Sequence, residues 1–231
     1  GSAGLAVVDW PNSFGYNMFL YPLSRMTGGV YYEHAHRLFG SLVGLTTLAD
    51  SLTAIKRLVY DERRISLPEL TALLDHNWEG AEELWQTCLC RMPKFGNEDA
   101  EADSMTMRWL MRINDWLFTQ RTAFGGPWGM DIIGWSGAVV LGESTGATPD
   151  GRRKGEPLAD CAGPAQGRDR AGITAVLNSM LGFPTREVHG PLALNLRVPV
   201  SAVDTPEGEE KLAALLRSYL ERGGQQVQVT I

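Results

Sequence analysis

Three cysteines, at positions 88, 90 and 161, are the side chains of this sequence best suited to nucleophilic or metal-binding chemistry. The spacing Cys88-x-Cys90 lacks the second ligand pair that a structural zinc site needs, so no metal site is predicted. An odd number of cysteines makes no disulfide framework and favours a reducing compartment, here the cytoplasm. We therefore interpret Cys88, Cys90 and Cys161 as buried or incidental thiols.

A second group of polar residues lies in a segment that favours a turn. Thr148-Pro149-Asp150-Gly151 has proline at the second position, aspartate next and glycine last, which is typical of a β-turn. Arg152 follows and begins a short basic stretch. Most such turns only reverse the chain, so we expect a structural role for Thr148, Pro149, Asp150, Gly151 and Arg152.

Helices dominate the elements that would position these residues. Apolar residues recur at three- and four-residue steps over 41–60, which predicts a helix there. Ser66-Leu67-Pro68-Glu69 is a capping box with proline in the first turn, so a short helix should run from there to about Leu74. Further helices are predicted over 79–90, 100–121, 173–180 and 207–222.

Strand signals are fewer. The short apolar run 139–141 predicts a buried strand, and the alternating segments 192–200 and 226–231 predict two more. Segments 123–138 and 145–170 are rich in glycine, proline or aspartate and should be irregular. Strands separated by helices indicate an α/β fold, and so few strands favour a helix-rich part with a partial sheet over a closed barrel.

The composition excludes several classes of function. The chain has 231 residues, of which 44% are hydrophobic, and a net charge of -6. That charge argues against a nucleic-acid partner, and no apolar run is long enough to span a membrane. Residues 1–48 hold only four charged residues, whereas the rest of the chain is rich in them. This change predicts a boundary near residue 48, with two unlike pieces joined there.

Five motifs from residue 49 onward occur in an informative order. They are Asp50-Ser51-Leu52-Thr53-Ala54-Ile55-Lys56, Pro93-Lys94-Phe95-Gly96-Asn97-Glu98-Asp99, Thr145 to Arg153 with Gly155 to Asp160, Ala175-Val176-Leu177-Asn178-Ser179, and Tyr219 to Gln225. Any one alone is weak, but the ordered series is specific. It resembles glycyl radical enzymes of the pyruvate formate-lyase family over residues 49–231.

The resemblance implies radical chemistry on an α/β barrel, of which residues 49–231 would form a part. In that family an activating enzyme, which uses S-adenosylmethionine and an iron–sulfur cluster, installs a glycyl radical, and this radical oxidises a cysteine to a thiyl radical. The family's cysteine loop lies upstream of Asp50, where residues 1–48 contain no cysteine. Its Arg-Val-x-Gly-Tyr/Phe loop lies downstream of the last strand. We therefore expect a truncated chain that lacks both essential residues, binds no cofactor itself and is inactive alone.

Residues 1–48 resemble a segment of haem A synthases. Gly4 to Pro11 is similar to a lumen-side loop of that family, and Glu33-His34-Ala35-His36-Arg37 is similar to its haem-ligating helix. The resemblance implies His36 as an iron ligand and Glu33 as its acidic partner, on an N-terminal helix over about 29–60. Charges at 50, 56 and 57 would each cost about 2.5–3.5 kcal/mol inside a membrane, so no membrane span is expected.

Three hypotheses of function remain. The first is a fragment of a glycyl radical lyase, dehydratase or decarboxylase, with an activating enzyme as partner. The second is a membrane haem protein related to haem A synthase. The third is a non-catalytic interaction module, in which the partial barrel serves as a binding surface and homo-oligomers can form through exposed sheet edges.

Overall fold

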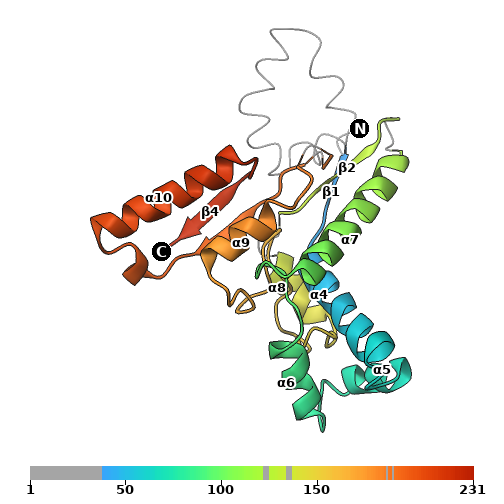
Figure 1. Ribbon diagram of the computed structural model, residues 1–231. Coiled ribbons are helices and arrows are strands. Elements are labelled where there is room, and N and C mark those ends of the chain that lie inside the picture. Colours follow the sequence, from blue (N-terminus) through green and yellow to red (C-terminus); the bar gives the residue numbers. More distant parts are fainter. Residues whose placement is uncertain (1–37, 122–124, 134–136, 186, 189) are drawn as a thin grey trace.

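The computed structural model describes residues 38–121, 125–133, 137–185, 187–188 and 190–231 (Figure 1). The elements along the chain are β1 (Leu38–Ser41), α4 (Leu45–Ile55), the π-helix η1 (Lys56–Asp61), α5 (Leu67–Asp75), α6 (Glu82–Cys90), α7 (Ala100–Thr119), β2 (Trp128–Asp131), α8 (Gly137–Ser144), α9 (Ile173–Met180), β3 (Leu194–Arg197), the 3-10 helix η2 (Val200–Ala202), α10 (Pro206–Glu221) and β4 (Val227–Thr230).

The strands form two parallel pairs. Strand β1 pairs with β2, and β3 pairs with β4. An isolated parallel bridge between Ile132 and Leu192 joins the end of β2 to the start of β3. Among the described residues the strands form no closed barrel. The helix-rich α/β fold with a partial sheet is therefore confirmed, and helices connect the paired parallel strands as such strands require.

Two hydrophobic cores hold these elements together. The larger core surrounds the strands and includes Phe95 from the loop before α7, Leu110 from α7, Val176 from α9 and Leu194 from β3. The smaller core lies between α4–η1, α5 and α6, at the lower end of the molecule in Figure 1. Its buried members are Ala54, Leu58, Leu70, Trp78, Cys88 and Met92. The segment between α6 and α7 therefore runs from one core to the other.

Local sequence signals explain where several helices begin. Ser66 accepts a hydrogen bond from the Glu69 backbone N–H, and the Glu69 carboxylate accepts one from the Ser66 N–H. The predicted capping box is thus confirmed. Asp99 caps α7 by accepting hydrogen bonds from the N–H groups of the second and third helical residues. Because α7 packs against α4, this cap fixes the loop that precedes α7 relative to α4.

The predicted helix over 41–60 is confirmed at its C-terminal end but begins later than predicted. Gly44 has φ of 80°, a left-handed conformation that ends the preceding segment, and the helix begins at Leu45. Residues 38–41 form β1 instead. The helix over about 29–60, which the resemblance to haem A synthases implied, is therefore also wrong where the structure describes its first half. The last turns are π-helical. The boundary predicted near residue 48 falls inside α4.

The predicted strand over 139–141 is also wrong. These residues lie in α8, and Val139, Val140 and Leu141 are 46%, 61% and 46% exposed. A short apolar run has no period that separates a strand from a helix, which explains the error. The strand that does occur nearby, β2, lies in the segment predicted to be irregular.

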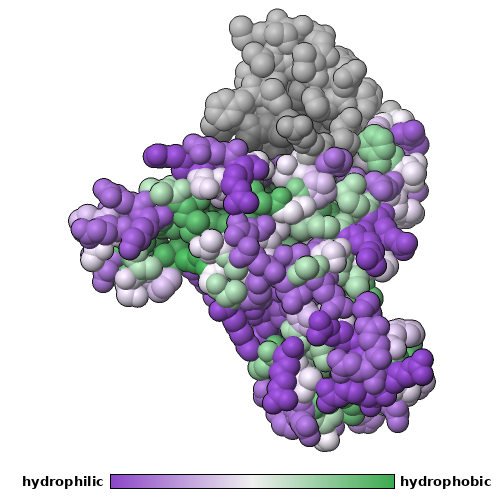
Figure 2. Space-filling model, viewed as in Figure 1, coloured by the Kyte–Doolittle hydropathy of each residue, from purple (hydrophilic) through white to green (hydrophobic). Residues whose placement is uncertain are grey.

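Hydrophobic side chains also reach the surface. Figure 2 shows an apolar area where α10 and β4 lie, next to strongly hydrophilic residues. Leu220 is 53% exposed and Ile231 is 66% exposed. Together with the apolar face of α8, this surface gives the chain several places where further protein could pack.

Candidate functional site

The segment from Thr148 to Arg152 forms a tight turn around a buried carboxylate. Asp150 is 1% exposed and accepts hydrogen bonds from the Thr148 hydroxyl, the Arg152 N–H and the Ser51 hydroxyl of α4. Pro149 occupies the second position of the turn, as predicted. Asp150 therefore ties this long loop to α4.

The guanidinium of Arg152 organises the rest of the loop. It is 4% exposed and donates hydrogen bonds to four backbone carbonyl oxygens, those of Thr145 at 3.1 Å, Gly146 at 2.7 Å, Arg153 at 2.8 Å and Glu156 at 2.8 Å. Because these carbonyls belong to no helix or sheet, Arg152 supplies partners that they would otherwise lack.

Gly151 allows the loop to approach α6 closely. Its φ is +94°, and a Cβ added there would lie 2.8 Å from the backbone N and Cα of Leu89. The Gly151 carbonyl accepts a hydrogen bond of 2.8 Å from the Trp85 indole. Only glycine satisfies both the conformation and the approach.

A second buried carboxylate, Asp50 of α4, lies near this loop. One of its oxygens accepts the Phe95 N–H at 2.9 Å, and the other has no hydrogen-bond partner. Burial raises its pKa to about 8, with Lys94 and the Phe95 hydrogen bond acting in the opposite direction. Asp50 thus holds the loop before α7 in place and stays largely protonated near neutral pH.

The β3–β4 pair is amphipathic. In β3, Leu194 and Leu196 are buried, whereas Asn195 and Arg197 are exposed. The register pairs Asn195 with Gln228 and Arg197 with Thr230, so polar residues of both strands share one face. Parallel sheets are usually covered on both faces and apolar on both. A polar face on a parallel pair is therefore unusual.

A polar cavity of about 190 Å³ lies over this face, and we call it the strand-face cavity. Its lining residues are Asp160, Gly163, Pro164, Gln166, Gly167, Asp169, Val176, Asn195, Leu196, Arg197, Gln228 and Thr230. Carboxylates, amides and a guanidinium converge here, and Asn195 donates a hydrogen bond to Asp160. Such a set can bind a small molecule with hydroxyl, amine or carboxylate groups.

The three thiols lie in different surroundings. Cys88 is buried, and burial raises its pKa to about 11, so it is a poor nucleophile. Cys90 is exposed at the end of α6. Cys161 is buried beside the strand-face cavity, with its sulfur 3.4 Å from the Asn195 amide nitrogen. The structure therefore brings none of them together.

Glu33 and His36, the residues implied in haem binding, lie outside the described residues. In the part of the chain that the structure describes, no helix is both long and apolar enough to cross a membrane.

The amphipathic parallel strands and the helices between them define an α/β protein with a polar cavity over one strand face. The pyruvate formate lyase-like family profile matches residues 23–142, and the glycine radical profile matches residues 158–231. The chain therefore belongs to the pyruvate formate lyase-like family of glycyl radical enzymes. The first match includes Glu33 and His36, and the resemblance to haem A synthases is not shown.

Individual relatives agree with this assignment. The chain is 32% identical over 189 residues to trans-4-hydroxy-L-proline dehydratase of Clostridioides difficile, and 33% identical over 202 residues to a probable dehydratase of Escherichia coli. These matches cover 82% and 84% of this chain, but only 24% and 25% of the relatives. The chain thus spans about a quarter of the length of the curated relatives that it matches.

Solved structures give the same result. The C. difficile hydroxyproline dehydratase with its substrate bound aligns with a TM-score of 0.78 at 31% identity, over 84% of this chain and 24% of that one. A structure from Roseburia inulinivorans, described for 1,2-propanediol dehydration, aligns with a TM-score of 0.80 at 30% identity, over 84% of this chain and 26% of that one. The fold of the described residues is thus shared with solved members of the family.

Proposed function

We propose that this chain forms part of the scaffold of a glycyl radical dehydratase. The observation that carries the proposal is the polar face of β3–β4 under the strand-face cavity, in a chain that matches both family profiles. In the family's chemistry, the glycyl radical oxidises a cysteine to a thiyl radical. The thiyl radical then abstracts a hydrogen atom from the substrate. The residues of this chain bind and orient the substrate.

The strand-face cavity would hold the polar groups of such a substrate. Arg197 offers a charged donor and Asp160 offers a carboxylate, with Asn195 hydrogen-bonded to Asp160 between them. Elimination of water needs a substrate hydroxyl held in one orientation, which donors and acceptors on rigid strands provide. Because Asn195 and Arg197 are on β3, whose other face is in the core, their positions are well fixed.

The loop from Thr148 to Arg152 supports the cavity without contacting a substrate. Asp150 and Arg152 are buried and use their polar groups within the protein. The same loop continues to Asp160 and Gln166, which line the cavity. We infer a structural role for Thr148, Pro149, Asp150, Gly151 and Arg152.

Further proposals follow from the family. The strands would be completed into an α/β barrel by other parts of a longer protein, and the activating enzyme would be its partner. The division of the chain near residue 48 stays a prediction, which the DNA that encodes the flanking residues can test. A cytoplasmic location is proposed on the odd number of cysteines in the sequence.

A chimera tests the function directly. Residues 38–231 replace the equivalent segment of the C. difficile hydroxyproline dehydratase, and the purified chimera is activated and supplied with trans-4-hydroxy-L-proline, glycerol or 1,2-propanediol. We expect dehydration of at least one of them. A folded chimera that forms its radical but dehydrates none of them would count against the proposal.

A matched pair of variants separates the cavity from the scaffold. Arg197→Gln in the chimera should raise KM at least about tenfold, because a charged contact with the substrate is lost. Arg217→Gln on α10 removes the same charge from an exposed position outside the lining of the cavity and should leave KM unchanged. Equal effects of the two would show that the strand-face cavity does not bind the substrate.

The interaction-module hypothesis has one observation in its favour. Val139, Val140 and Leu141 expose an apolar face on α8, which is unusual for an isolated chain. If this face binds a second copy, Val140→Lys should shift an oligomer to monomer in light scattering, whereas an unchanged mass would remove this alternative.

A further inference from the structure

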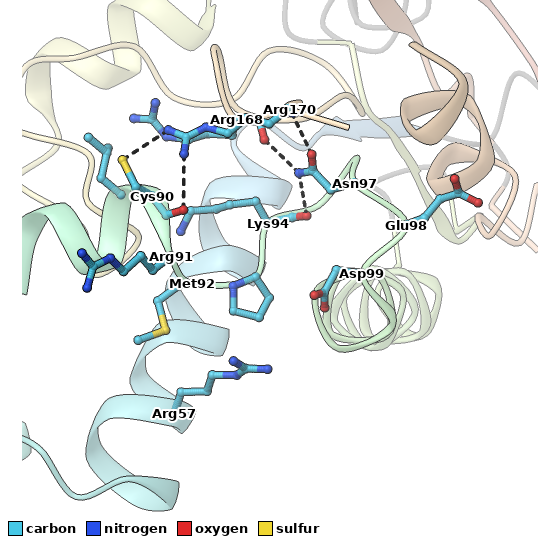
Figure 3. Close-up of a pocket in the computed structure, with 12 residues that line it drawn as sticks. Arg57, Cys90, Arg91, Met92, Lys94, Asn97, Glu98, Asp99, Arg168 and Arg170 are labelled. Atoms are coloured by element: carbon cyan, nitrogen blue, oxygen red, sulfur yellow. Dashed lines mark hydrogen bonds between the residues drawn. The ribbon is translucent and has the colours of Figure 1, made fainter. Parts of the chain in front are cut away.

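A second pocket, of about 330 Å³, lies away from the strand-face cavity (Figure 3). We call it the cationic pocket, and its lining residues are Arg57, Leu89, Cys90, Arg91, Met92, Pro93, Lys94, Asn97, Glu98, Asp99, Arg168 and Arg170. It shares no lining residue with the strand-face cavity. Arg168 and Arg170 alternate along one loop with Gly167 and Asp169, which line the other cavity, so this loop separates the two.

Positive charge is concentrated in this pocket although the chain carries a net charge of -6. Five of the lining residues are basic and two are acidic. Both acidic residues are engaged elsewhere, since Asp99 caps α7 and Glu98 accepts a hydrogen bond from Asn178 at 3.0 Å. Neither acid makes an ion pair with a base of the pocket, and the basic residues outnumber the acidic ones.

Only one of the basic residues is paired. Arg57 makes an ion pair of 2.6 Å with Glu101. In the described part of the chain, the other four, Arg91, Lys94, Arg168 and Arg170, make no ion pair. Arg170 donates only to the Cys90 carbonyl and sulfur, both at 3.3 Å. The pocket thus holds several unneutralised cations.

Lys94 gives the sharpest indication of a ligand. Its side chain is 6% exposed, yet its Nζ has no hydrogen-bond partner. The carboxyl of Asp50 is nearby, but it makes neither a hydrogen bond nor an ion pair with Lys94, and one of its own oxygens also has no hydrogen-bond partner. A buried ammonium without a partner is strongly unfavourable, so such a group marks a place where a partner binds.

The pocket is held open by contacts of its own. The Asn97 amide donates to the carbonyls of Lys94 at 3.1 Å and Arg168 at 2.8 Å, and its oxygen accepts the Arg170 N–H at 2.7 Å. Figure 3 shows these bonds joining the segment that carries Lys94 to the loop that carries the two arginines. The cations are therefore positioned before any ligand arrives, which lowers the cost of binding.

We propose that the cationic pocket binds a small oxyanion, a phosphate or carboxylate group, with Lys94 as its buried ligand and Arg91, Arg168 and Arg170 around it. A volume of about 330 Å³ is several times that of one phosphate-sized ion, which leaves room for an attached organic group of a few atoms. Guanidinium and ammonium donors together suit such groups.

Phosphate binding to the full chain tests the proposal. Thermal unfolding and phosphorus NMR are measured while inorganic phosphate is added, with chloride at matched ionic strength as the control. We expect a saturable rise of the unfolding midpoint and a saturable change of the phosphorus line width with phosphate. A parallel titration with acetate distinguishes a phosphate site from a carboxylate site, and saturation by either supports the proposal.

Variants make the result specific. Lys94→Met should weaken binding at least about tenfold, and Arg91→Gln, at an exposed position that should not disturb folding, should weaken it about three- to tenfold. Arg217→Gln on α10 should bind as the unchanged chain does. No saturable response to either anion, or equal responses in Arg91→Gln and Arg217→Gln, would overturn the proposal.

Discussion

The protonation of the buried Asp50 carboxyl can be tested without any catalytic activity. It is fully buried on α4, and burial raises its pKa from 3.8 to about 8. The unfolded chain releases this proton above about pH 4, whereas the folded chain keeps it until about pH 8. Between these values the folded state binds one more proton, so the free energy of unfolding falls as the pH rises.

The size of the effect follows from the one proton. Each pH unit in that window removes about 1.4 kcal/mol from the free energy of unfolding. Asp50→Asn abolishes this contribution, because an amide does not titrate but its oxygen can still accept the Phe95 N–H. The variant's stability should therefore fall less steeply between about pH 5 and pH 7, by about 1.4 kcal/mol per unit.

Urea unfolding followed by circular dichroism across that range measures both slopes. Asp115→Asn, at an exposed position of α7, makes the same chemical change and should keep the slope of the unchanged chain. Equal slopes for the unchanged chain and Asp50→Asn would refute the argument that Asp50 is protonated when folded.

Three further predictions concern the loop and the thiols. Gly151→Ala should lower the free energy of unfolding by at least about 1 kcal/mol more than Gly155→Ala. Both glycines have positive φ, but only at Gly151 would a Cβ contact the Leu89 backbone. Equal shifts of the thermal unfolding midpoint in the two variants would contradict this. Arg152→Lys should cost about 2–4 kcal/mol in urea, because an ammonium cannot reach four carbonyls, and an unchanged midpoint would remove its proposed role. With a thiol-specific reagent, Cys90 should supply the fast phase, and a fast phase that survives Cys90→Ser would be inconsistent with the burial of the other two thiols.

Elements with strong local signals could be predicted from the sequence. The capping box at Ser66, the helix 173–180 and the alternating strand near the C-terminal end are found as expected. The strand predicted over 192–200 is confirmed only for Leu194–Arg197. Each of these depends on residues within one turn or one strand, which a single sequence displays.

Elements fixed by distant contacts could not be predicted. Strand β2 has no alternating pattern and exists because it pairs with β1, about 90 residues earlier in the chain. The left-handed Gly44 divides a continuous helical pattern, and the pattern itself carries no sign of it. Tertiary contact overrides local preference in both cases.

The candidate sites show the same division. The turn from Thr148 to Arg152 could be recognised because most of its hydrogen bonds are local. The cationic pocket around Lys94 could not be predicted, because the walls of the pocket come from segments that lie more than 70 residues apart in the chain. One signal was available: polar and apolar residues alternate along β3 and β4.

The most direct test of the central claim is electron paramagnetic resonance of the chimera that carries residues 38–231 in the hydroxyproline dehydratase. After treatment with the activating enzyme, we expect the doublet of a glycyl radical in the chimera and no doublet from the 231-residue chain by itself. A folded chimera without the doublet would contradict the claim that these residues form a working part of a glycyl radical enzyme.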